Sequence, residues 1–453
     1  MLKRKIENKI ENWLHHPQWH KAYMIQGARQ VGKTYSIRAV LEREGVNYVE
    51  LNFITDKDFR DVFDKIRNVD DLVSYASAYG VRNIRRGETV FFFDEVQECP
   101  ELMTMIKFFV DEGSFRYILS GSLLGITYKK LRSAPVGYLI VDNMYPLDFD
   151  EFLQIYGFSP ELKEKLRESF DSRTEVSPYI HDEMMKRFYY YLIVGGMPDA
   201  VVEYQNSHDF NMVAVIQKSI TDIYMGDFSK YESDPAQKLF LTEIYRKIPA
   251  QLMNPNKRFN YVSVSKGLTY EEGRDSFLWL TAAGVAIPVY NIVSPAIPML
   301  LNAKSNLFKL FLSDAGLLSY SLGEEARRAM ILRAEDVSYG AIFENVTASE
   351  LLAHGLTPYY YNSKKYGELD FVVEYRGKAL AIEVKSGKTY TRHSALSSVL
   401  EVKEYGLEEA VVLSSHNVST DGKITYLPIY MLMFLEKEEG SLPSVDFSPL
   451  PTV

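Results

Sequence analysis

The octapeptide Gly27-Ala-Arg-Gln-Val-Gly-Lys-Thr34 constrains the fold of this chain more than any other stretch. It matches the pattern G-x-x-x-x-G-K-[ST] at every specified position. The short apolar segment Ala22 to Gln26 predicts a strand before it, and Tyr35 to Glu44 has apolar residues at helical spacing after it. An ordinary glycine turn before a helix is the alternative interpretation. Strand, loop and helix in this order instead predict an α/β domain that cradles phosphate groups.

The residue types in this loop suit a nucleoside triphosphate. Its glycines let several backbone N–H groups point inward at the positive end of the following helix, which makes a nest for anions. Lys33 would reach the β- and γ-phosphates, and the Thr34 hydroxyl would bind magnesium. We therefore expect ATP and Mg²⁺ as cofactors. The residues expected to contact the nucleotide are Gly27, Ala28, Arg29, Gln30, Val31, Gly32, Lys33, Thr34 and Tyr35.

A second motif, Thr89-Val-Phe-Phe-Phe-Asp94-Glu95, has the acidic residues that such a loop needs. Its strand-favouring run predicts a strand buried on both faces, and ligands bind at the C-terminal ends of strands in open α/β sheets. Asp94 would hold magnesium through water, and Glu95 takes the position of the base that polarises the attacking water in AAA-type ATPases. A solvated Asp-Glu loop is the weaker alternative, because the pair directly follows a buried strand.

A third strand is predicted over Phe115 to Leu119, and it ends in Ser120-Gly-Ser122. A hydroxyl at this point could contact the γ-phosphate, and we favour Ser120 over Ser122. The alternative is a common Ser-Gly-Ser turn after a strand.

Composition and charge limit the class of protein. The 453 residues predict two or three domains, and 46% hydrophobic residues are enough for packed cores. The single cysteine, Cys99, excludes an intramolecular disulfide framework. A net charge of -9 argues against a general nucleic-acid coat. No signal-like or membrane-spanning run is evident, so we expect a cytoplasmic protein with no membrane partner.

The chain changes its organisation after Met144 to Phe152, where the sheet-like part ends. Helical segments follow, and Val285 to Val293 is strand-like among them, which indicates a winged helix or a simple connector. The predicted domains are a P-loop core at 1–155, a helical lid at 156–208, a helical or winged-helix-like middle at 209–328, a C-terminal α/β domain at 329–437 and a tail at 438–453.

The C-terminal region contains a predicted β-hairpin. Gly367 to Tyr375 and Lys378 to Gly387 are strand-like, with Arg376-Gly377 between them as a two-residue turn. Counting back from that turn pairs Asp370 with Glu383, and the period of two places Lys385 on the same face. Two carboxylates and a lysine then converge.

This grouping suits a metal-dependent phosphodiesterase. Asp370 and Glu383 would hold Mg²⁺ or Mn²⁺, while Lys385 would stabilise the attacking hydroxide or the developing phosphate charge. The pattern resembles the PD-(D/E)XK nuclease motif, and Glu344 would match the extra acidic residue on a preceding helix. A surface hairpin with an ordinary salt-bridged face is the alternative, and spacing alone does not separate the two.

Taken together, these segments resemble a prokaryotic family of AAA-type ATPases with a C-terminal domain of unknown function that is similar to PD-(D/E)XK nucleases. The matching segments are GARQVGKT, FFFDEVQECP, SGSLLGI, MYPLDFDEF, YYLIVGGMPDAVVEY, FKLFLSDAGLL, GAIFENVTASEL, GELDFVVEY and AIEVKSGK. The resemblance implies an ATPase domain, a winged-helix-like middle and a nuclease-like end. Lys33, Thr34, Asp94 and Glu95 would lie at the nucleotide, and Glu344, Asp370, Glu383 and Lys385 at the second site.

The chain departs from the family at one point, because Gly137 is followed by Tyr138 where many relatives carry a basic residue. An arginine supplied by a neighbouring subunit to the γ-phosphate is also not assigned, although Arg116 and Arg132 are candidates. DNA and further copies of this chain are the partners that these features allow.

The first functional hypothesis is an ATP-driven enzyme or switch in which nucleotide binding gates a metal-dependent nuclease site on nucleic acid. The second is a nucleotide-dependent regulatory or interaction protein whose nuclease-like domain binds DNA or protein without cleavage, which the acidic overall charge favours. A kinase-like enzyme acting on a small molecule is a third, for which no substrate pocket is evident.

Overall fold

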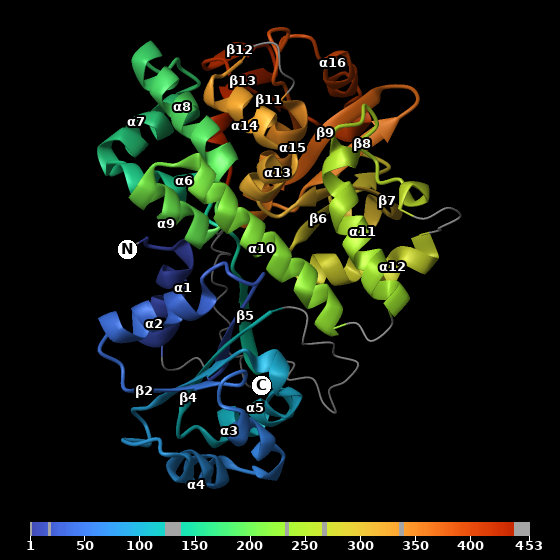
Figure 1. Ribbon diagram of the computed structural model, residues 1–453. Coiled ribbons are helices and arrows are strands. Elements are labelled where there is room, and N and C mark those ends of the chain that lie inside the picture. Colours follow the sequence, from blue (N-terminus) through green and yellow to red (C-terminus); the bar gives the residue numbers. More distant parts are fainter. Residues whose placement is uncertain are drawn as a thin grey trace, which may run out of the picture.

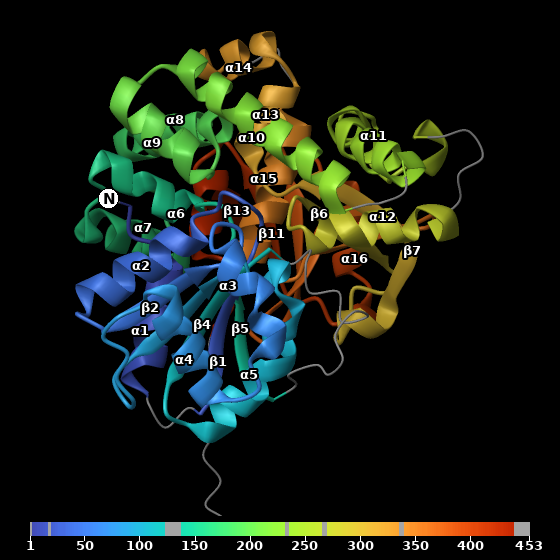
Figure 2. The same cartoon turned by 60° about the horizontal axis from the view of Figure 1, so that its bottom comes forward.

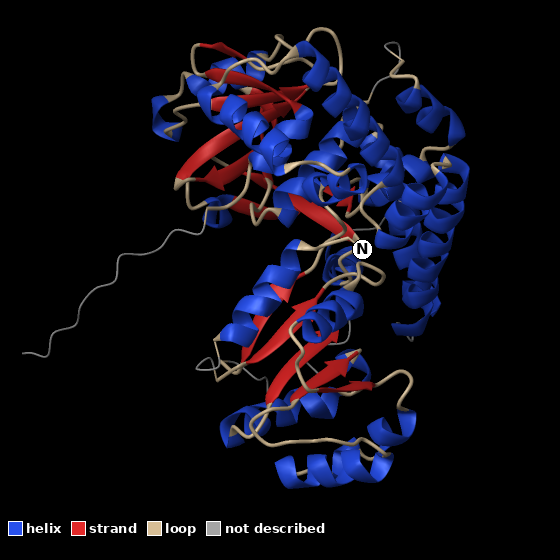
Figure 3. Cartoon of the chain, turned by 90° about the vertical axis from the view of Figure 1, so that its left-hand side faces the viewer, coloured by secondary structure: helices blue, strands red, loops and turns tan. Residues whose placement is uncertain are grey.

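The computed structural model describes residues 2–16, 20–122, 137–231, 235–264, 270–334 and 339–438. Two sheets lie at opposite ends of the molecule, with a mass of helices beside and between them (Figure 1, Figure 3). The described parts fall into an N-terminal α/β domain, a helical region and a C-terminal α/β domain. The predicted tail at 438–453 lies outside the described residues apart from Glu438.

The N-terminal sheet is parallel throughout, with the strand order β2-β3-β4-β1-β5. Its strands are β1 (Ala22–Gln26), β2 (Tyr48–Asn52), β3 (Val90–Asp94), β4 (Arg116–Gly121) and β5 (Leu139–Asn143). The helices of this domain are α1 (Lys5–His15), α2 (Lys33–Arg43), α3 (Lys57–Asp61), α4 (Val69–Tyr79) and α5 (Pro100–Glu112), with the 3-10 turns η1 (Phe63–Lys65) and η2 (Val96–Glu98).

Strand β3 is buried along its whole length, as the apolar run in its sequence predicts. Its side chains alternate between two cores. Phe91 and Phe93 pack with residues of α3, α4 and α5, whereas Phe92 belongs to a core that also contains residues of α1 and α2. Burial on both faces leaves only the strand's C-terminal end, at Asp94, for polar chemistry. The helices α1 to α5 lie around the strands of this sheet (Figure 2).

The helical region follows the first sheet. Its long helix α10 crosses the middle of the molecule (Figure 1). Its elements are α6 (Phe149–Phe152), η5 (Leu153–Tyr156), α7 (Pro160–Ser172), α8 (Pro178–Val194), α9 (Pro198–Ser207), α10 (Phe210–Tyr231), α11 (Pro235–Leu252), η6 (Tyr261–Ser263) and α12 (Tyr270–Ala282). One continuous apolar core joins these helices to the N-terminal sheet and to the inner face of the second sheet.

The second sheet has eight strands in the order β12-β13-β11-β10-β9-β8-β6-β7, with parallel and antiparallel pairs. Its strands are β6 (Ala286–Ile292), β7 (Ala303–Leu312), β8 (Tyr359–Ser363), β9 (Gly367–Tyr375), β10 (Lys378–Val384), β11 (Ala410–Ser414), β12 (Ser419–Asp421) and β13 (Ile424–Pro428). The associated helices and turns are η7 (Met299–Asn302), α13 (Ala315–Ser321), α14 (Glu324–Ile331), α15 (Gly340–Ala353), α16 (Ser394–Leu400), η8 (Lys403–Tyr405) and η9 (Ile429–Phe434).

The hairpin of β6 and β7, which the sequence places in the middle domain, is part of this second sheet. Strand β6 pairs in parallel with β8, so Tyr290 lies opposite Tyr359. The boundary predicted at residue 328 therefore falls between strands of one sheet, and the hairpin extends the C-terminal sheet instead of standing apart as a wing.

The predicted hairpin of β9 and β10 has the expected register. Arg376 and Gly377 both have positive φ angles, 51° and 72°, as a two-residue turn of the type I′ class requires. Lys378 pairs with Tyr375 and Ile382 pairs with Phe371, so the next pair is Glu383 and Asp370. The turn chemistry therefore sets which carboxylates face one another.

Candidate functional site

The phosphate-binding loop has the backbone shape that its sequence requires. Gly32 adopts a left-handed φ of 98° and caps the N-terminus of α2, which begins at Lys33. Gly27 lies against the chain after β5, where an added Cβ would come within 2.2 Å of the Met144 carbonyl oxygen. The glycine at 27 is therefore demanded by a close tertiary approach, and the glycine at 32 by backbone conformation.

Lys33 lies folded back on its own loop. Its side chain is buried, and its ammonium donates to the carbonyl oxygens of Gly27 at 3.0 Å and Ala28 at 2.8 Å. Burial lowers the pKa of Lys33 to about 8, against the opposing effect of Glu95 and Asp94. A cation held only by neutral carbonyls can transfer to an incoming phosphate without leaving a buried charge behind.

Asp94 is the centre of a polar cluster at the C-terminal edge of the first sheet. It accepts hydrogen bonds from Thr34 Oγ1 at 2.9 Å, from Asn52 Nδ2 at 2.8 Å and from the Ser120 hydroxyl. Burial raises the pKa of Asp94 above its ordinary value. The adjacent hydroxyl of Thr34 and carboxylate of Asp94 fit the oxygen ligands that magnesium prefers.

Asn52 and Gln97 join this site and were missed by sequence reasoning. Asn52 ends β2, which lies next to β3, so its place at a strand end was the available signal. Gln97 Nε2 donates to Glu95 Oε2, and Gln97 Oε1 accepts from the Ser122 N–H at 3.2 Å. The backbone of Glu95 has a left-handed φ of 55°, which is uncommon for a residue other than glycine, and its side chain is fixed by the hydrogen bond from Gln97.

A pocket of about 640 Å³ opens beside these residues, which is within the size range of cofactor sites. Its lining includes Gln30, Gly32, Lys33, Thr34, Tyr35 and Glu95. Leu2, Arg4, Leu147, Pro198, Asp199, Val202, Gln205 and Asn206 also line it, and Pro198 and Arg4 lie close to Gly32. Polar groups for phosphates and apolar groups for a base therefore lie in one cavity.

The other predicted loop residues lie outside this pocket. Gly27 and Ala28 line a second, mostly apolar cavity of about 500 Å³ against β6 and β8. Val31 is fully buried, and its carbonyl accepts from Arg4 Nη1 at 2.8 Å. Arg29 forms an ion pair with Asp227 of α10.

The arginine-finger candidates find little support. Arg116 lies at the start of β4, at the opposite end of the strand from Ser120, and its guanidinium donates to the carbonyls of Trp13 and Leu14. Its role within this chain is therefore structural. Arg132 lies outside the described residues. Tyr138, the departure from the family pattern, donates from its hydroxyl to Asp111 at 3.1 Å.

The second predicted site is also brought together by the fold. Glu344 of α15, Asp370 of β9, Glu383 of β10 and Lys385 share one region: Lys385 Nζ lies 2.6 Å from Glu383 Oε1, and Asp370 Oδ2 accepts from the Val384 N–H at 2.9 Å. Burial and the neighbouring Asp370 raise the pKa of Glu383 to about 8. The same two causes raise the pKa of Glu344.

Two further lysines, missed by sequence reasoning, neutralise this cluster. Lys257 pairs with Glu344 Oε1, and Lys309 lies 3.8 Å from Glu344 Oε2 and 2.7 Å from Glu368 Oε1. Lys309 is 1% exposed, and although burial alone would lower its pKa, the carboxylates of Glu344, Asp370 and Glu368 raise it. The signal was a lysine inside the apolar run of β7.

The glutamates of this second cluster are paired with lysines in the structure. Within the part of the chain that the structure describes, no group of three or more His, Cys, Asp or Glu side chains is placed to hold one. Lysine ammonium groups provide the positive charge instead. The predicted Mg²⁺ or Mn²⁺ ligation by Glu344, Asp370 and Glu383 therefore has no support from this geometry.

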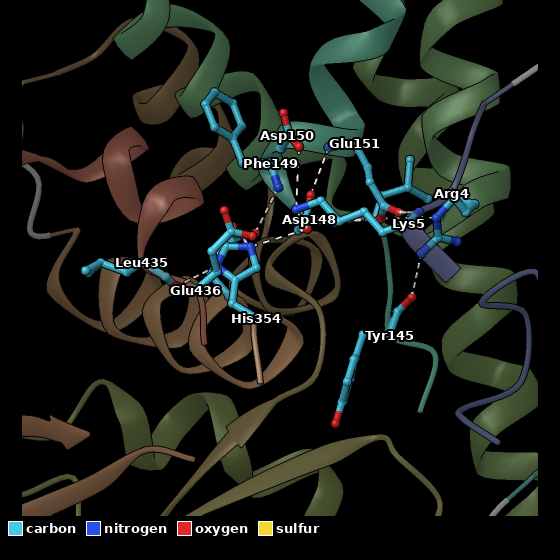
Figure 4. Close-up of polar contacts among 12 residues, drawn as sticks. Arg4, Lys5, Tyr145, Asp148, Phe149, Asp150, Glu151, His354, Leu435 and Glu436 are labelled. Carbon is cyan, nitrogen blue, oxygen red and sulfur yellow. Dashed lines mark hydrogen bonds and ion pairs between the residues drawn. The ribbon is translucent and has the colours of Figure 1, made fainter. Parts of the chain in front are cut away.

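Ion pairs at α6 connect the N-terminal α/β domain with the C-terminal α/β domain. Arg4 Nε lies 3.1 Å from Glu151 Oε2, and Lys5 Nζ lies 2.7 Å from Asp148 Oδ2 at the start of α6. On the other side, His354 Nε2 at the end of α15 lies 3.3 Å from the same Asp148 oxygen (Figure 4). Helix α15 also carries Glu344, so one helix is in contact with both regions.

Three family models match separate parts of the chain. An AAA domain matches residues 19–153, a domain of unknown function (DUF8612) matches 185–328, and a second domain of unknown function (DUF4143) matches 339–432. An uncharacterized protein of Methanocaldococcus jannaschii, MJ1544, is 22% identical over 380 residues, which are 80% of this chain and 74% of that one.

Solved structures with a related arrangement have low overall similarity. The Walker-type ATPase PABY2304 of Pyrococcus abyssi has a TM-score of 0.44 and 15% identity, and the alignment covers 71% of this chain and 96% of that one. The Orc1 protein of Aeropyrum pernix in complex with DNA has a TM-score of 0.32 and 13% identity, with 74% and 93% covered.

Among the described residues, no helix combines the length and the apolarity that crossing a bilayer requires. The AAA match covers the loop, Asp94, Glu95 and Ser120. Gln30, Gly32, Lys33, Thr34 and Glu95 line the pocket, and Asp94 accepts hydrogen bonds from Thr34 and Ser120. This chain therefore carries an AAA-type P-loop ATPase domain over residues 19–153.

Proposed function

We propose that this protein binds magnesium-ATP in the pocket beside the P-loop and hydrolyses it with Glu95 as the base. The observation that carries the proposal is that Thr34 and Glu95 line a cavity large enough for a nucleotide, while buried Asp94 accepts a hydrogen bond from the Thr34 hydroxyl. An ordinary glycine turn would need neither the buried carboxylate nor the cavity.

The chain's own residues account for the steps of the reaction. Loop N–H groups bind the phosphates, and Lys33 moves from the carbonyls of Gly27 and Ala28 to the β- and γ-phosphates. Thr34 and Asp94 would hold magnesium, which would offset phosphate charge. Glu95 takes a proton from the attacking water. The oxygen of that water bonds to the γ-phosphorus while the bond between the γ-phosphorus and the oxygen of the leaving ADP breaks.

The apolar lining of the pocket would bind the base. Leu2, Leu147 and Val202 offer apolar surface to a flat ring, and the amides of Gln205 and Asn206 can both donate and accept hydrogen bonds. These features support a purine ring, with ATP as the expected nucleotide.

For the C-terminal domain we infer a nucleotide-dependent binding role rather than cleavage. Lys257, Lys309 and Lys385 pair with Glu344, Glu368 and Glu383, so lysine ammonium groups already supply positive charge to these carboxylates. This supports the interaction-protein hypothesis. The nuclease hypothesis requires these lysines to withdraw from the carboxylates when nucleotide or nucleic acid binds.

The ATPase proposal is tested by two substitutions. Lys33→Ala should abolish ATP binding, because the phosphates lose their main cation, and Glu95→Gln should bind ATP but hydrolyse it at least a hundredfold more slowly. Nucleotide affinity and phosphate release are the measurements. Normal turnover by either purified, folded variant would overturn the assignment.

The two C-terminal hypotheses are separated by a cleavage assay. Single-stranded, duplex and branched DNA are incubated with the purified protein in Mg²⁺ or Mn²⁺, with and without ATP, beside the Asp370→Ala variant. We expect ATP turnover without cutting. Cutting that disappears in Asp370→Ala would instead establish a nuclease, and binding of the same DNAs without cutting would identify nucleic acid as the partner.

A further inference from the structure

Arg29 occupies the middle of the P-loop, yet its side chain is directed to another element. Its Nη1 lies 2.9 Å from Asp227 Oδ1 on α10, with side-chain exposures of 18% and 7%. The hydroxyl of Tyr224, one turn earlier on α10, donates to the Arg29 carbonyl at 3.0 Å. The loop is therefore attached to α10 through both the backbone and the side chain of one residue.

This arrangement places two cations close together in an anion-binding loop. The Arg29 charge adds to the effect of burial in lowering the pKa of Lys33, so the two side chains repel one another. Asp227 offsets that repulsion for Arg29. An ion pair this well buried is sensitive to any new charge nearby, because little water screens it.

A bound triphosphate would be a strong competitor for Arg29. ATP brings several negative charges to the loop, and an arginine forms short, paired hydrogen bonds to phosphate oxygens. Asp227 would then lie close to a polyanion and be repelled by it. Binding of the γ-phosphate therefore weakens the attachment of the loop to α10 at the same time as it satisfies Arg29.

We propose that Arg29, whose side chain lies outside the pocket against α10, turns to contact the γ-phosphate of bound ATP, and that its ion pair with Asp227 is the switch through which nucleotide occupancy moves α10. This inference rests on the proposed ATP binding at the P-loop. It assigns to Arg29, within the same chain, the phosphate contact that an arginine from a neighbouring subunit would otherwise make.

Helix α10 is placed to pass such a movement to the C-terminal domain. Phe228, next to Asp227, packs its ring against Trp279 of α12 at 5.2 Å and against Tyr245 of α11 at 5.6 Å. Helix α11 contacts β7. Lys257, shortly after α11, and Lys309 of β7 are the lysines that pair with Glu344. A shift of α10 would therefore be passed through α11 and β7 to Lys257 and Lys309, which neutralise the acidic cluster.

The test compares ATP and ADP affinities of the wild type with those of Arg29→Ala, Arg29→Lys and Asp227→Asn. Arg29→Ala should weaken ATP binding about tenfold to a hundredfold and ADP binding less than about threefold, as expected for a charged hydrogen bond to the γ-phosphate. Arg29→Lys, which keeps the charge without the paired donors, should lie between. Asp227→Asn should tighten ATP binding about threefold or more, because Arg29 no longer has to leave a carboxylate.

Hydrogen exchange of α10 provides a second readout that does not depend on affinity. ATP should increase amide exchange over residues 222–231 in the wild type, and Asp227→Asn should show faster exchange there without nucleotide. Tyr224→Phe is the matched control, because it removes the bond to the Arg29 carbonyl but leaves the ion pair. It should keep the ATP-to-ADP affinity ratio of the wild type.

Two results would overturn the inference. One is equal loss of ATP and ADP affinity in Arg29→Ala, which indicates a purely structural role, and the other is weaker ATP binding by Asp227→Asn. Lys33→Ala distinguishes this failure from failure of the proposed function. If Lys33→Ala abolishes binding while Arg29→Ala affects both nucleotides equally, only the role of Arg29 is wrong; if the wild type binds no ATP, the proposed function itself is wrong.

Discussion

The P-loop pocket and the C-terminal acidic cluster contain the same kinds of side chain, but their lysines have different partners. Lys33 donates to two neutral carbonyls beside an open cavity, whereas Lys309 is buried between the carboxylates of Glu344 and Glu368. A lysine that donates only to neutral carbonyls can bind an incoming anion. A lysine paired with carboxylates stabilises the fold, because its removal leaves those negative charges without a counter-ion.

The largest expected effect distinguishes these two lysines. Lys309→Met should destabilise the protein by about 3 to 5 kcal/mol, since Glu344 and Glu368 lose a buried counter-ion. Lys33→Met should leave the free energy of unfolding within about 1 kcal/mol of the wild type, because it removes a desolvated charge. Denaturant unfolding is the measurement.

The double variant Lys309→Met/Glu344→Gln provides the control for this comparison. It should recover part of the lost stability, because the amide needs no cation. Equal unfolding free energies for Lys309→Met and Lys33→Met would contradict the distinction drawn between the two sites.

A smaller effect is expected from crowding the P-loop. Gly27→Ala puts a methyl group 2.2 Å from the Met144 carbonyl oxygen, so the loop must shift. We expect a loss of about 1 to 3 kcal/mol of stability together with at least a tenfold loss of ATP affinity. Gly226→Ala, in α10 with open space around the new methyl group, should instead be neutral or stabilising by up to about 1 kcal/mol.

The connection between the two regions should depend on pH. Burial, with Asp148 nearby, raises the pKa of Glu350 to about 7, and Asp148 and Glu350 raise the pKa of His354 although burial alone would lower it. Glu350 also accepts from the Tyr191 hydroxyl at 2.8 Å, and Lys5 is the cation on Asp148. The three titratable groups of this junction therefore act together.

The sign follows from the direction of each shift. A raised pKa gives a contribution that is fully present below the group's ordinary value and is lost as the pH rises through the folded value. Glu350 therefore weakens the junction as the pH rises from 4.5 to about 7, and His354 weakens it as the pH rises above 6.5. Asp148, whose pKa is lowered, loses its contribution only below pH 3.8. Stability should fall by about 1 kcal/mol per pH unit from Glu350. Glu350→Gln should flatten the profile measured by unfolding, and an unchanged slope would contradict the assignment.

The smallest expected effect concerns Gln97. Its amide holds Glu95 Oε2 and the Ser122 N–H, so Gln97→Leu should lower kcat about fivefold by releasing the base, while the KM for ATP stays within about twofold. Steady-state hydrolysis measures this. An increase in KM with kcat unchanged would indicate that Gln97 acts on nucleotide binding instead.

Local sequence patterns were enough for the elements that carry the nucleotide site. The strand before the loop, the helix after it and the buried strand ending at Asp94 are all present, because backbone period and glycine placement act within a few residues. The pairing of Asp370 with Glu383 also followed from the two-residue turn at Arg376 and Gly377, since a tight turn sets the register.

The partners from distant segments were not predictable in this way. Asn52 beside Asp94, and Lys257 and Lys309 around Glu344, come from segments whose own patterns indicate only a strand end or a charge within an apolar run. The sequence therefore placed Asp370, Glu383 and Lys385 at the C-terminal hairpin, and the fold added Lys257 and Lys309 beside Glu344.

The sequence by itself determined a P-loop, its acidic strand and a hairpin with facing carboxylates, because each depends on hydrogen bonds and side-chain periods within one short stretch. Only the tertiary structure decided which basic side chain pairs with which acidic side chain. Arg29 and Asp227 are 198 positions apart, and Lys257 and Glu344 are 87 apart. Such pairs depend on how α10, β7 and α15 pack, and packing is set by the whole core rather than by any local pattern.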